Sequence, residues 1–314
     1  MSSEKSWERE TIEKLASASL REQKANRRWG IFFKILFFSY IVFISFSFFD
    51  LFDFPSSPVS GKHTGLVQVF GEIGLEQDAS AGNVINGLRE AFSNSGTKGV
   101  IIHINSPGGS PAQSRRIFKS VLALKEDYPE TPVYAVVEDI CASGAYYVAI
   151  AADKIFVDPA SIVGSIGVVI NGFGFPESLK KLGIQRRLFA AGDNKGFLDP
   201  FSDLNPSHEK HVLSLLDQIH QQFKKNVEKS RGDRLAENQD IFSGLIWTGE
   251  ESMKLGLVDQ IGTIDYVAKE IIGAEVIINF SHEAHFFDKL ATEISGKVVD
   301  IALSYIYEQQ FAVK

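Results

Sequence analysis

The 314-residue sequence predicts an α/β protein in which a parallel sheet with crossover helices follows one transmembrane helix. Strand-like and helix-like segments alternate in the order β-α-β-α-β-α-β over residues 66–158, which favours a parallel sheet. The run 35–49 contains no charged residue. Glycine-rich turns follow two of the expected strands, at residues 107–109 and 142–144. Because the carboxyl ends of parallel strands meet at one edge, we expect the functional site there.

The amino-terminal region is predicted to be a tail (1–28) followed by a transmembrane helix (29–54). The apolar run extends from Trp29 to Phe49, and about 20 such residues cross a bilayer, with Lys34 close enough to one end to snorkel. A cleaved signal peptide is an alternative, but a polar segment of 28 residues precedes the run. A buried core helix is less suitable because the run has no polar face.

The charges that flank this run predict its orientation. Lys24, Arg27 and Arg28 precede it, whereas Asp50 and Asp53 follow it. The positive-inside rule therefore places residues 1–28 in the cytoplasm and the chain after about residue 55 outside.

Charge and cysteine content exclude several classes of function. From Pro55 onward there are 24 Lys and Arg against 32 Asp and Glu, a net charge of −8, so nucleic-acid binding is not expected. The seven His residues are scattered without metal-ligand spacing, and we expect neither a metal nor a cofactor. Cys141 is the single cysteine. It lies two residues before Ser143 and could be a rival nucleophile, but a small core residue is the better interpretation.

A linker (55–65) leads into a globular domain (66–275), where hydrophobic periodicity gives the expected elements. The first half has strands at 66–70, 99–104, 133–137 and 154–158, with helices between them; Ser80 is the expected cap of the first helix. The second half has a turn into a strand at 164–170, helices at 176–182 and 206–231, and a strand, helix and turn within 241–262. The long helix should bury one face, comprising Val212, Leu215, Leu216, Ile219 and Phe223. In the extension (276–314), an apolar stripe over 287–305 predicts an amphipathic helix.

Ser143 lies in the second glycine turn, between an extended apolar run and a helix-forming segment. By itself this position is typical of a helix cap as well as of a nucleophile. Backbone amides in the two turns could form an oxyanion hole, which contributes on the order of 3 kcal/mol per donor. Ordinary glycine turns are the alternative interpretation of 107–109 and 142–144.

Six segments resemble, in order, the signal peptide peptidase A family of membrane-bound serine–lysine peptidases. They are N-S-P-G-G (105–109), A-S-G-A-Y-Y (142–147), A-D-K-I (152–155), G-S-I-G-V (164–168), Lys195 and G-L-V-D-Q-I-G (256–262). The resemblance covers about residues 65–270 and matches the short form with one peptidase repeat. It implies the Clp protease and crotonase fold and a place in the bacterial inner membrane.

The resemblance also implies roles for individual residues. Ser143 would be the nucleophile, Lys195 the general base, and Ser165 the partner that orients the lysine; the oxyanion hole would comprise Gly109, Gly108 and Gly144. A lysine acts as a base only when neutral, so its pKa must fall by about 3 from a reference near 10.4.

Lysine in a glycine-rich loop is ordinarily solvated. The family resolves this in homo-oligomeric rings, where the lysine of one chain meets the serine of its neighbour. Hydrophobic peptides such as released signal peptides are the implied substrates.

Two departures and two alternative functions accompany this interpretation. Ala145 stands where the family usually has a second glycine, and His103, in mid-strand, is expected to be a core histidine and not the base.

An acyl-CoA hydratase or isomerase on the same fold would use paired amides without a Ser–Lys pair. An inactive membrane scaffold is the other alternative, and retention of both Ser143 and Lys195 argues against it.

Overall fold

The computed structural model describes residues 4–48 and 61–282. The chain divides into two units. One is the compact unit Gly61–His285, which holds the sheet; the other comprises Met1–Ser60 and Phe286–Lys314, and its described element is the helix α1 (Glu4–Phe48). The amphipathic helix predicted over 287–305 lies outside the described residues.

The sheet of the compact unit is largely parallel, as predicted, with the strand order β6-β5-β3-β2-β1-β8; β4 also pairs with β3, and β7 pairs with β4. β1 and β2 lie side by side, β2 pairs with β3, and β6 is antiparallel to β5. The strands are β1 (His63–Phe70), β2 (Thr97–Ser106), β3 (Val133–Ala142), β4 (Lys154–Val157), β5 (Ile162–Gly164), β6 (Ile246–Thr248), β7 (Gln260–Ile261) and β8 (Ile277–Asn279).

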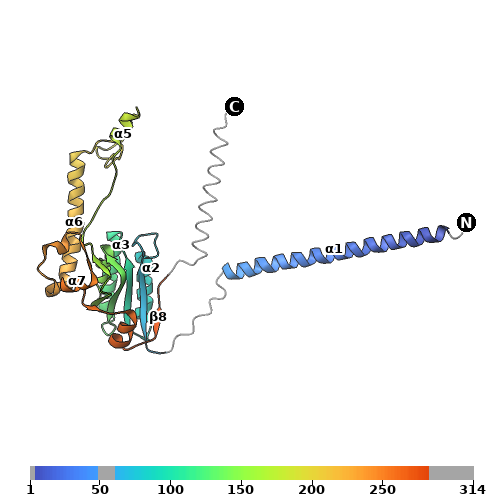
Figure 1. Ribbon diagram of the computed structural model, residues 1–314, viewed down its shortest axis with the longest axis horizontal. Coiled ribbons are helices and arrows are strands. Elements are labelled where there is room, and N and C mark those ends of the chain that lie inside the picture. The colour runs from blue at the N-terminus through green and yellow to red at the C-terminus, as the bar shows by residue number, and fades with distance from the viewer. Residues whose placement is uncertain (1–3, 49–60, 283–314) are drawn as a thin grey trace. The chain divides into compact units, whose positions relative to one another are not determined.

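Helices connect the first strands and cover the sheet (Figure 1). The main core cluster joins one face of the sheet to α2 (Ala81–Ser93), α3 (Pro111–Asp127) and α4 (Gly144–Ala149). On the other face, Ile101 and Phe156 pack against η3 (Val267–Ile272). β2 is therefore buried on both sides, which explains its almost continuous apolar sequence.

Serine residues cap the two helices before the site. The side chain of Ser80 accepts a hydrogen bond from the amide of Asn83 at the start of α2, confirming the expected cap. Ser110 does the same for Gln113 at the start of α3, where Pro111 occupies the first turn. Both caps satisfy amides that the helix itself leaves without partners.

The long helix α6 (Pro206–Arg231) is buried only in its carboxyl-terminal half. Its first half extends from the sheet toward the short helix α5 (Pro176–Lys181), and we call the segment 168–213 the arm (Figure 1). Of the predicted inner face, Phe223 is buried, but Leu215 is exposed. Val212, Leu216 and Ile219 are half-buried, so the predicted inner face is confirmed as the less exposed side of the helix, with its cover increasing toward the carboxyl-terminal end.

The strand expected at the end of 164–170 is also absent. β5 ends at Gly164, and residues 165–175 have no regular structure. β6 pairs antiparallel with β5, and Ser165 has φ 53°, which turns the chain away from the sheet. The apolar run Val168–Ile170 therefore has no sheet edge to join.

The remaining short elements surround the carboxyl-terminal end of α6. They are η1 (Gly232–Arg234), η2 (Gln239–Phe242), α7 (Gly249–Lys254) and α8 (Ile264–Tyr266). The strand, helix and turn predicted within 241–262 are thus confirmed as β6, α7 and the turn before β7.

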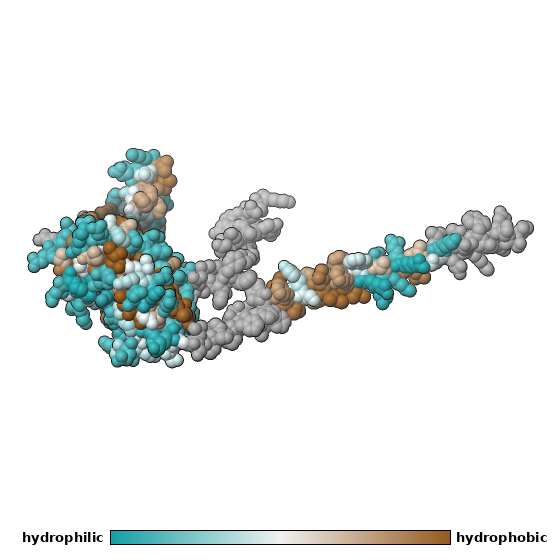
Figure 2. Space-filling view, turned by 60° about the horizontal axis from the view of Figure 1, so that its bottom comes forward, coloured by the Kyte–Doolittle hydropathy of each residue, from teal (hydrophilic) through white to brown (hydrophobic). Residues whose placement is uncertain are grey.

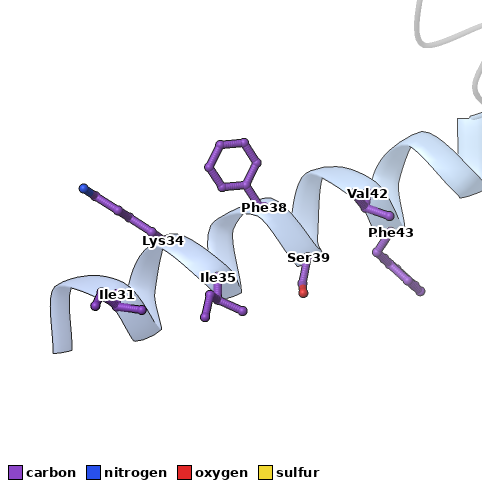
Figure 3. A pocket seen from close by; sticks show the side chains of 7 residues that line it. All are labelled: Ile31, Lys34, Ile35, Phe38, Ser39, Val42 and Phe43. Atoms are coloured by element: carbon purple, nitrogen blue, oxygen red, sulfur yellow. The ribbon is translucent and has the colours of Figure 1, made fainter. Parts of the chain in front are cut away.

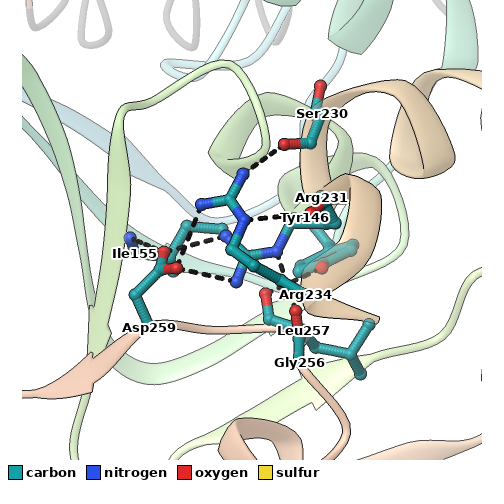
Figure 4. A network of polar contacts seen from close by, with 8 residues as sticks. All are labelled: Tyr146, Ile155, Ser230, Arg231, Arg234, Gly256, Leu257 and Asp259. Atoms are coloured by element: carbon teal, nitrogen blue, oxygen red, sulfur yellow. Dashed lines mark hydrogen bonds and ion pairs between the residues drawn. The ribbon is translucent and has the colours of Figure 1, made fainter. Parts of the chain in front are cut away.

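A buried ion pair ties this end of α6 to the sheet (Figure 4). Arg231, which is 3% exposed, donates to both carboxylate oxygens of Asp259 at 2.8 and 2.9 Å. Asp259 also accepts from the amide of Ile155 in β4, and Arg231 donates to the carbonyl of Gly256. Although burial opposes it, hydrogen bonding and the attraction of Arg231 lower the pKa of Asp259.

Helix α1 carries the apolar run. Its large apolar side chains from Trp29 to Ile44 are 37% to 66% exposed, and Figure 3 shows them along one stretch of the helix. Figure 2 shows this stretch in brown beside a polar part nearer the amino terminus. Within residues 4–48 and 61–282, no helix has both the length and the apolarity to cross a bilayer. Residues 49–54 lie outside the described ranges, and the predicted span is not confirmed.

Candidate active site

Ser143 lies between the end of β3 and the start of α4, in a backbone conformation that few serines adopt. Its φ is 52° and its ψ is −120°. Such a conformation is strained for any residue with a Cβ. Backbone strain of this kind is concentrated at functional sites. The side chain makes no capping hydrogen bond to α4. The interpretation of Ser143 as an ordinary helix cap is therefore wrong.

Backbone contacts hold this strained residue in place. The amide of Ser143 donates to the carbonyl of Gly164 in β5 at 2.8 Å, and its carbonyl accepts from the amide of Tyr147 in α4 at 3.0 Å. Ser143 is thus fixed on one side by the end of β5 and on the other by α4. The Ser143 hydroxyl is left for other chemistry.

The glycine turn after β2 lies directly against Ser143. Gly108 has φ 101°, and a Cβ added to it would come within 2.7 Å of the Gly144 nitrogen and 2.9 Å of the Ser143 Cβ. A Cβ on Gly109, with φ 142°, would come within 2.3 Å of the Ile73 carbonyl oxygen. Glycine is required at both positions, both for space and for conformation.

Among the described residues, the amides of Gly109 and Gly144 have no acceptor. They are neighbours, since a Cβ on Gly144 would lie 3.3 Å from the Gly109 nitrogen. Amides that remain free beside a serine can stabilise an oxyanion. The Gly108 amide is already engaged with the Ser106 hydroxyl at 3.1 Å, so Gly108 supplies space and not a donor.

Ser165 is brought beside this cluster. It follows Gly164, whose carbonyl accepts from the Ser143 amide, and its own amide donates to the carbonyl of Leu245 in the loop before β6 at 2.7 Å. Like Ser143, it has a positive φ, at 53°. The structure therefore gathers five of the six predicted site residues at one edge of the sheet: Ser143, Gly108, Gly109, Gly144 and Ser165.

The sixth residue, Lys195, is not brought to Ser143 within the chain. It is exposed in the arm, and its neighbour Asn194 bonds to His208 near the start of α6. Tyr147, four residues after Ser143, bonds instead to Asn226. Because α6 rises 1.5 Å per residue, those two attachments lie about 27 Å apart along its axis. A lysine side chain does not span that distance.

Two nearby titratable groups are excluded as nucleophile or base. Burial raises the pKa of the Cys141 thiol well above its usual range, so the thiol stays protonated and Cys141 is a core residue, as predicted. His103 lies 3.3 Å from Glu138 and contacts the ring of Phe70. It is a partnered, mostly buried histidine, as expected.

Three supporting serines were not singled out by the sequence analysis. Ser106 bonds the Gly108 amide, Ser110 caps α3, and Ser114 lies against Gly144, where an added Cβ would come within 2.4 Å of the Ser114 hydroxyl. A Ser-Pro-Gly sequence at the end of a strand is a signal for the first contact, since serine often accepts from the amide two residues later. The contact of Ser114 depends on the tertiary fold and has no local signal.

Comparison with known proteins agrees with this geometry. The model of peptidase family S49 matches residues 126–275, which include Ser143, Ser165 and Lys195. A relative from Enterococcus faecium that bears the name signal peptide peptidase SppA is 30% identical over 192 residues, 60% of this chain and 55% of its own. The segment 126–275, which carries the candidate nucleophile, thus matches peptidase family S49.

Two further relatives are similar to this chain over more than half of its length. A relative from Methanocaldococcus jannaschii, named as a protease, is 33% identical over 62% of this chain and 62% of its own length. A protein of Brucella abortus named as the Na(+)/H(+) antiporter NhaA is 41% identical over 70% of this chain, but the match covers only 29% of that protein. The chain thus spans less than two thirds of the length of these relatives.

Among solved structures, a mutant of the 1510-N membrane-bound stomatin-specific protease matches 71% of this chain and 96% of its own. The identity is 15% and the TM-score is 0.37.

Proposed function

We propose that this protein is a serine endopeptidase in which Ser143 is the nucleophile. The observation that carries the proposal is the strained Ser143 backbone beside the free amides of Gly109 and Gly144. A serine in such a turn exposes its hydroxyl at the edge of a sheet. Two free amides beside it are what a tetrahedral acyl intermediate requires.

The reaction begins when the Ser143 hydroxyl attacks the carbonyl carbon of the scissile peptide bond. A neutral lysine takes the hydroxyl proton, a C–O bond forms, and the carbonyl oxygen becomes an oxyanion held by the amides of Gly109 and Gly144. The intermediate then collapses. The C–N bond breaks, and the departing amine takes the proton from the lysine, leaving an acyl-enzyme that water hydrolyses by the same sequence of steps.

Lys195 is the proposed base, supplied by a neighbouring copy of the chain. Two observations support an intermolecular origin: the attachments of the two residues lie about 27 Å apart along α6, and the arm exposes large apolar side chains such as Phe173 (82%) and Phe189 (92%). Assembly would cover these side chains and take the lysine out of water. Desolvation favours the neutral form that a general base requires. Ser165, beside Ser143, would orient the incoming amine.

Membrane attachment and substrate class form the second part of the proposal. The uncharged run 35–49, with basic residues before it and acidic residues after it, supports a single-pass anchor with residues 1–28 in the cytoplasm of a bacterium. The peptidase unit would then face outward from the inner membrane. A site anchored beside a bilayer suits hydrophobic peptides such as released signal peptides, and the name of the Enterococcus faecium relative supports that class.

Labelling with a fluorophosphonate tests the nucleophile. We expect the full-length wild-type chain in detergent to be labelled and to cleave an apolar peptide, and Ser143→Ala to do neither. Lys195→Ala should lose cleavage and label much more slowly. Labelling that persists in Ser143→Ala would remove Ser143 from the mechanism. A wild-type chain that is neither labelled nor active on peptides would favour the alternatives, an acyl-CoA hydratase type of site or an inactive scaffold.

A further inference from the structure

We propose that Ser106 is a positioning residue for the oxyanion hole, a role that rests on the proposed peptidase function. Its hydroxyl engages the Gly108 amide and thereby leaves the next amide, that of Gly109, directed to the substrate. Ser106 is the last residue of β2 and is fully buried. It is paired in register with Cys141, two residues before Ser143. The two strand ends that carry the site therefore meet at Ser106.

The contact itself is a short-range serine turn. The Ser106 hydroxyl oxygen accepts from the Gly108 amide at 3.1 Å, the pattern in which a serine satisfies the amide two residues later. Pro107, between them, has no N–H group. The Gly108 amide is therefore the first donor after the strand, and Ser106 is the side chain that satisfies it.

Two backbone groups that flank the Gly109 amide are held by the backbone of Ile73. The Gly108 carbonyl accepts from the Ile73 amide at 2.7 Å, and the Ser110 amide donates to the Ile73 carbonyl at 2.8 Å. Of the donors in this turn, the Gly109 amide alone lacks an acceptor among the described residues. Ser106 thus supplies the only side-chain contact that fixes the peptide preceding this amide, and it can be tested by substitution where the backbone contacts cannot.

Removal of the hydroxyl should act on the transition state more than on substrate binding. Without an acceptor, the buried Gly108 amide has to turn toward another partner, and the adjoining Gly109 amide moves with it. Loss of a whole oxyanion donor lowers kcat by about 100- to 1,000-fold. A displaced donor keeps part of its effect, so Ser106→Ala should lower kcat by about 10- to 100-fold at nearly constant KM.

The experiment measures kcat and KM per active site in the full-length chain, with the active fraction counted by fluorophosphonate titration. The affinity for a peptide aldehyde, whose serine adduct places an oxyanion in the hole, is measured in parallel. For Ser106→Ala we expect kcat and aldehyde affinity to fall by the same factor. Ser106→Thr, which keeps the hydroxyl, should restore most of both. Ser252→Ala is the matched control: Ser252 is equally buried and its hydroxyl bonds to Gly249 in α7, so its loss should leave both values unchanged.

Three results would overturn the inference. If Ser106→Ala has full kcat per labelled site and full aldehyde affinity, the hydroxyl does not position the donor. If only the labelled fraction falls, Ser106 serves folding alone. If the wild-type chain is neither labelled nor active on peptides, the proposed function fails and this inference fails with it, an outcome distinct from the first two.

Discussion

The region around Ser143 and the arm that carries Lys195 differ in almost every physical respect. Around Ser143, the backbone of two strand ends is buried, strained and held by short hydrogen bonds. The arm instead exposes its large apolar side chains, and Lys195 itself is solvated. The turn at Ser143 is already fixed by backbone contacts within the chain, whereas an uncovered apolar arm requires a surface to pack against. The contrast supports the proposal that Ser143 and Lys195 are two parts of one site that meet only between neighbouring chains.

The largest effect is expected from removal of the Ser143 hydroxyl. Ser143→Ala should lower kcat by at least about 1,000-fold, since loss of a nucleophile removes the covalent route. Thermal unfolding of the variant should match that of the wild type because alanine also carries a Cβ in the strained conformation. Steady-state cleavage of an apolar peptide and calorimetry check the two parts. Residual activity within tenfold of wild type would contradict the assignment.

The next effect concerns the ion pair that joins the carboxyl-terminal end of α6 to the sheet. Asp259→Asn leaves Arg231 buried without its counter-charge, and breaking a buried pair in this way costs about 3 to 5 kcal/mol. The midpoint of urea unfolding should fall accordingly. Lys254→Met, which breaks an exposed ion pair with Glu250, is the control and should leave the midpoint in place. An equal shift in both variants would mean that the Arg231–Asp259 pair has no special role.

An arm substitution should separate assembly from folding. Phe189→Ser should leave the unfolding free energy of the chain within about 0.5 kcal/mol of wild type, because the side chain is 92% exposed. If neighbouring chains cover it, association should weaken by about 2 kcal/mol, and peptidase activity should fall at low protein concentration. Sedimentation and activity over a dilution series measure both. Val276→Ser, on the body, is 55% exposed and serves as control; an equal loss there would refute the role of the arm.

A smaller effect concerns the strain stored at Ser143. Glycine adopts a positive φ without the clash of a Cβ, so Ser143→Gly should raise the unfolding free energy by about 1 kcal/mol while abolishing activity. Urea unfolding of this variant beside Ser143→Ala measures the difference. Equal stability of the two variants would show that the turn stores no strain.

The smallest effect is a pH dependence of the unfolding free energy that arises from His103. Burial, acting against the attraction of Glu138, lowers the pKa of His103 from 6.5. The unfolded chain therefore binds the proton more readily, so this contribution to stability is complete above about pH 6.5. It is lost as the pH falls from there through the lower folded pKa. His103→Gln should flatten this part of a plot of urea midpoint against pH, and an unchanged slope would exclude His103 as its origin.

Sequence patterns predicted much of the body and little of the arm. The strand and helix alternation and the two glycine turns are local signals, and they placed Ser143 and Gly109 at one edge of the sheet, whereas Ser165 was expected there only from the family resemblance. The apolar face of α6 was also a true pattern, but periodicity identifies a face without identifying its cover. The contact between Ser106 and Gly108 has a local signal, the Ser-Pro-Gly sequence at the end of a strand. Its importance becomes visible only when the structure shows which neighbouring amides lack an acceptor. The Arg231–Asp259 pair joins residues that no short-range rule connects.

Complementation between two inactive variants tests the central claim most directly. Ser143→Ala and Lys195→Ala chains are co-expressed at equal amounts and assayed for peptide cleavage. If Ser143 of one chain uses Lys195 of its neighbour, about one site in four combines two intact residues, and activity should return to about a quarter of wild type. If the two residues act within one chain, no mixed site is intact. Activity no greater than that of the separate variants, in assemblies shown to contain both chains, would contradict the account.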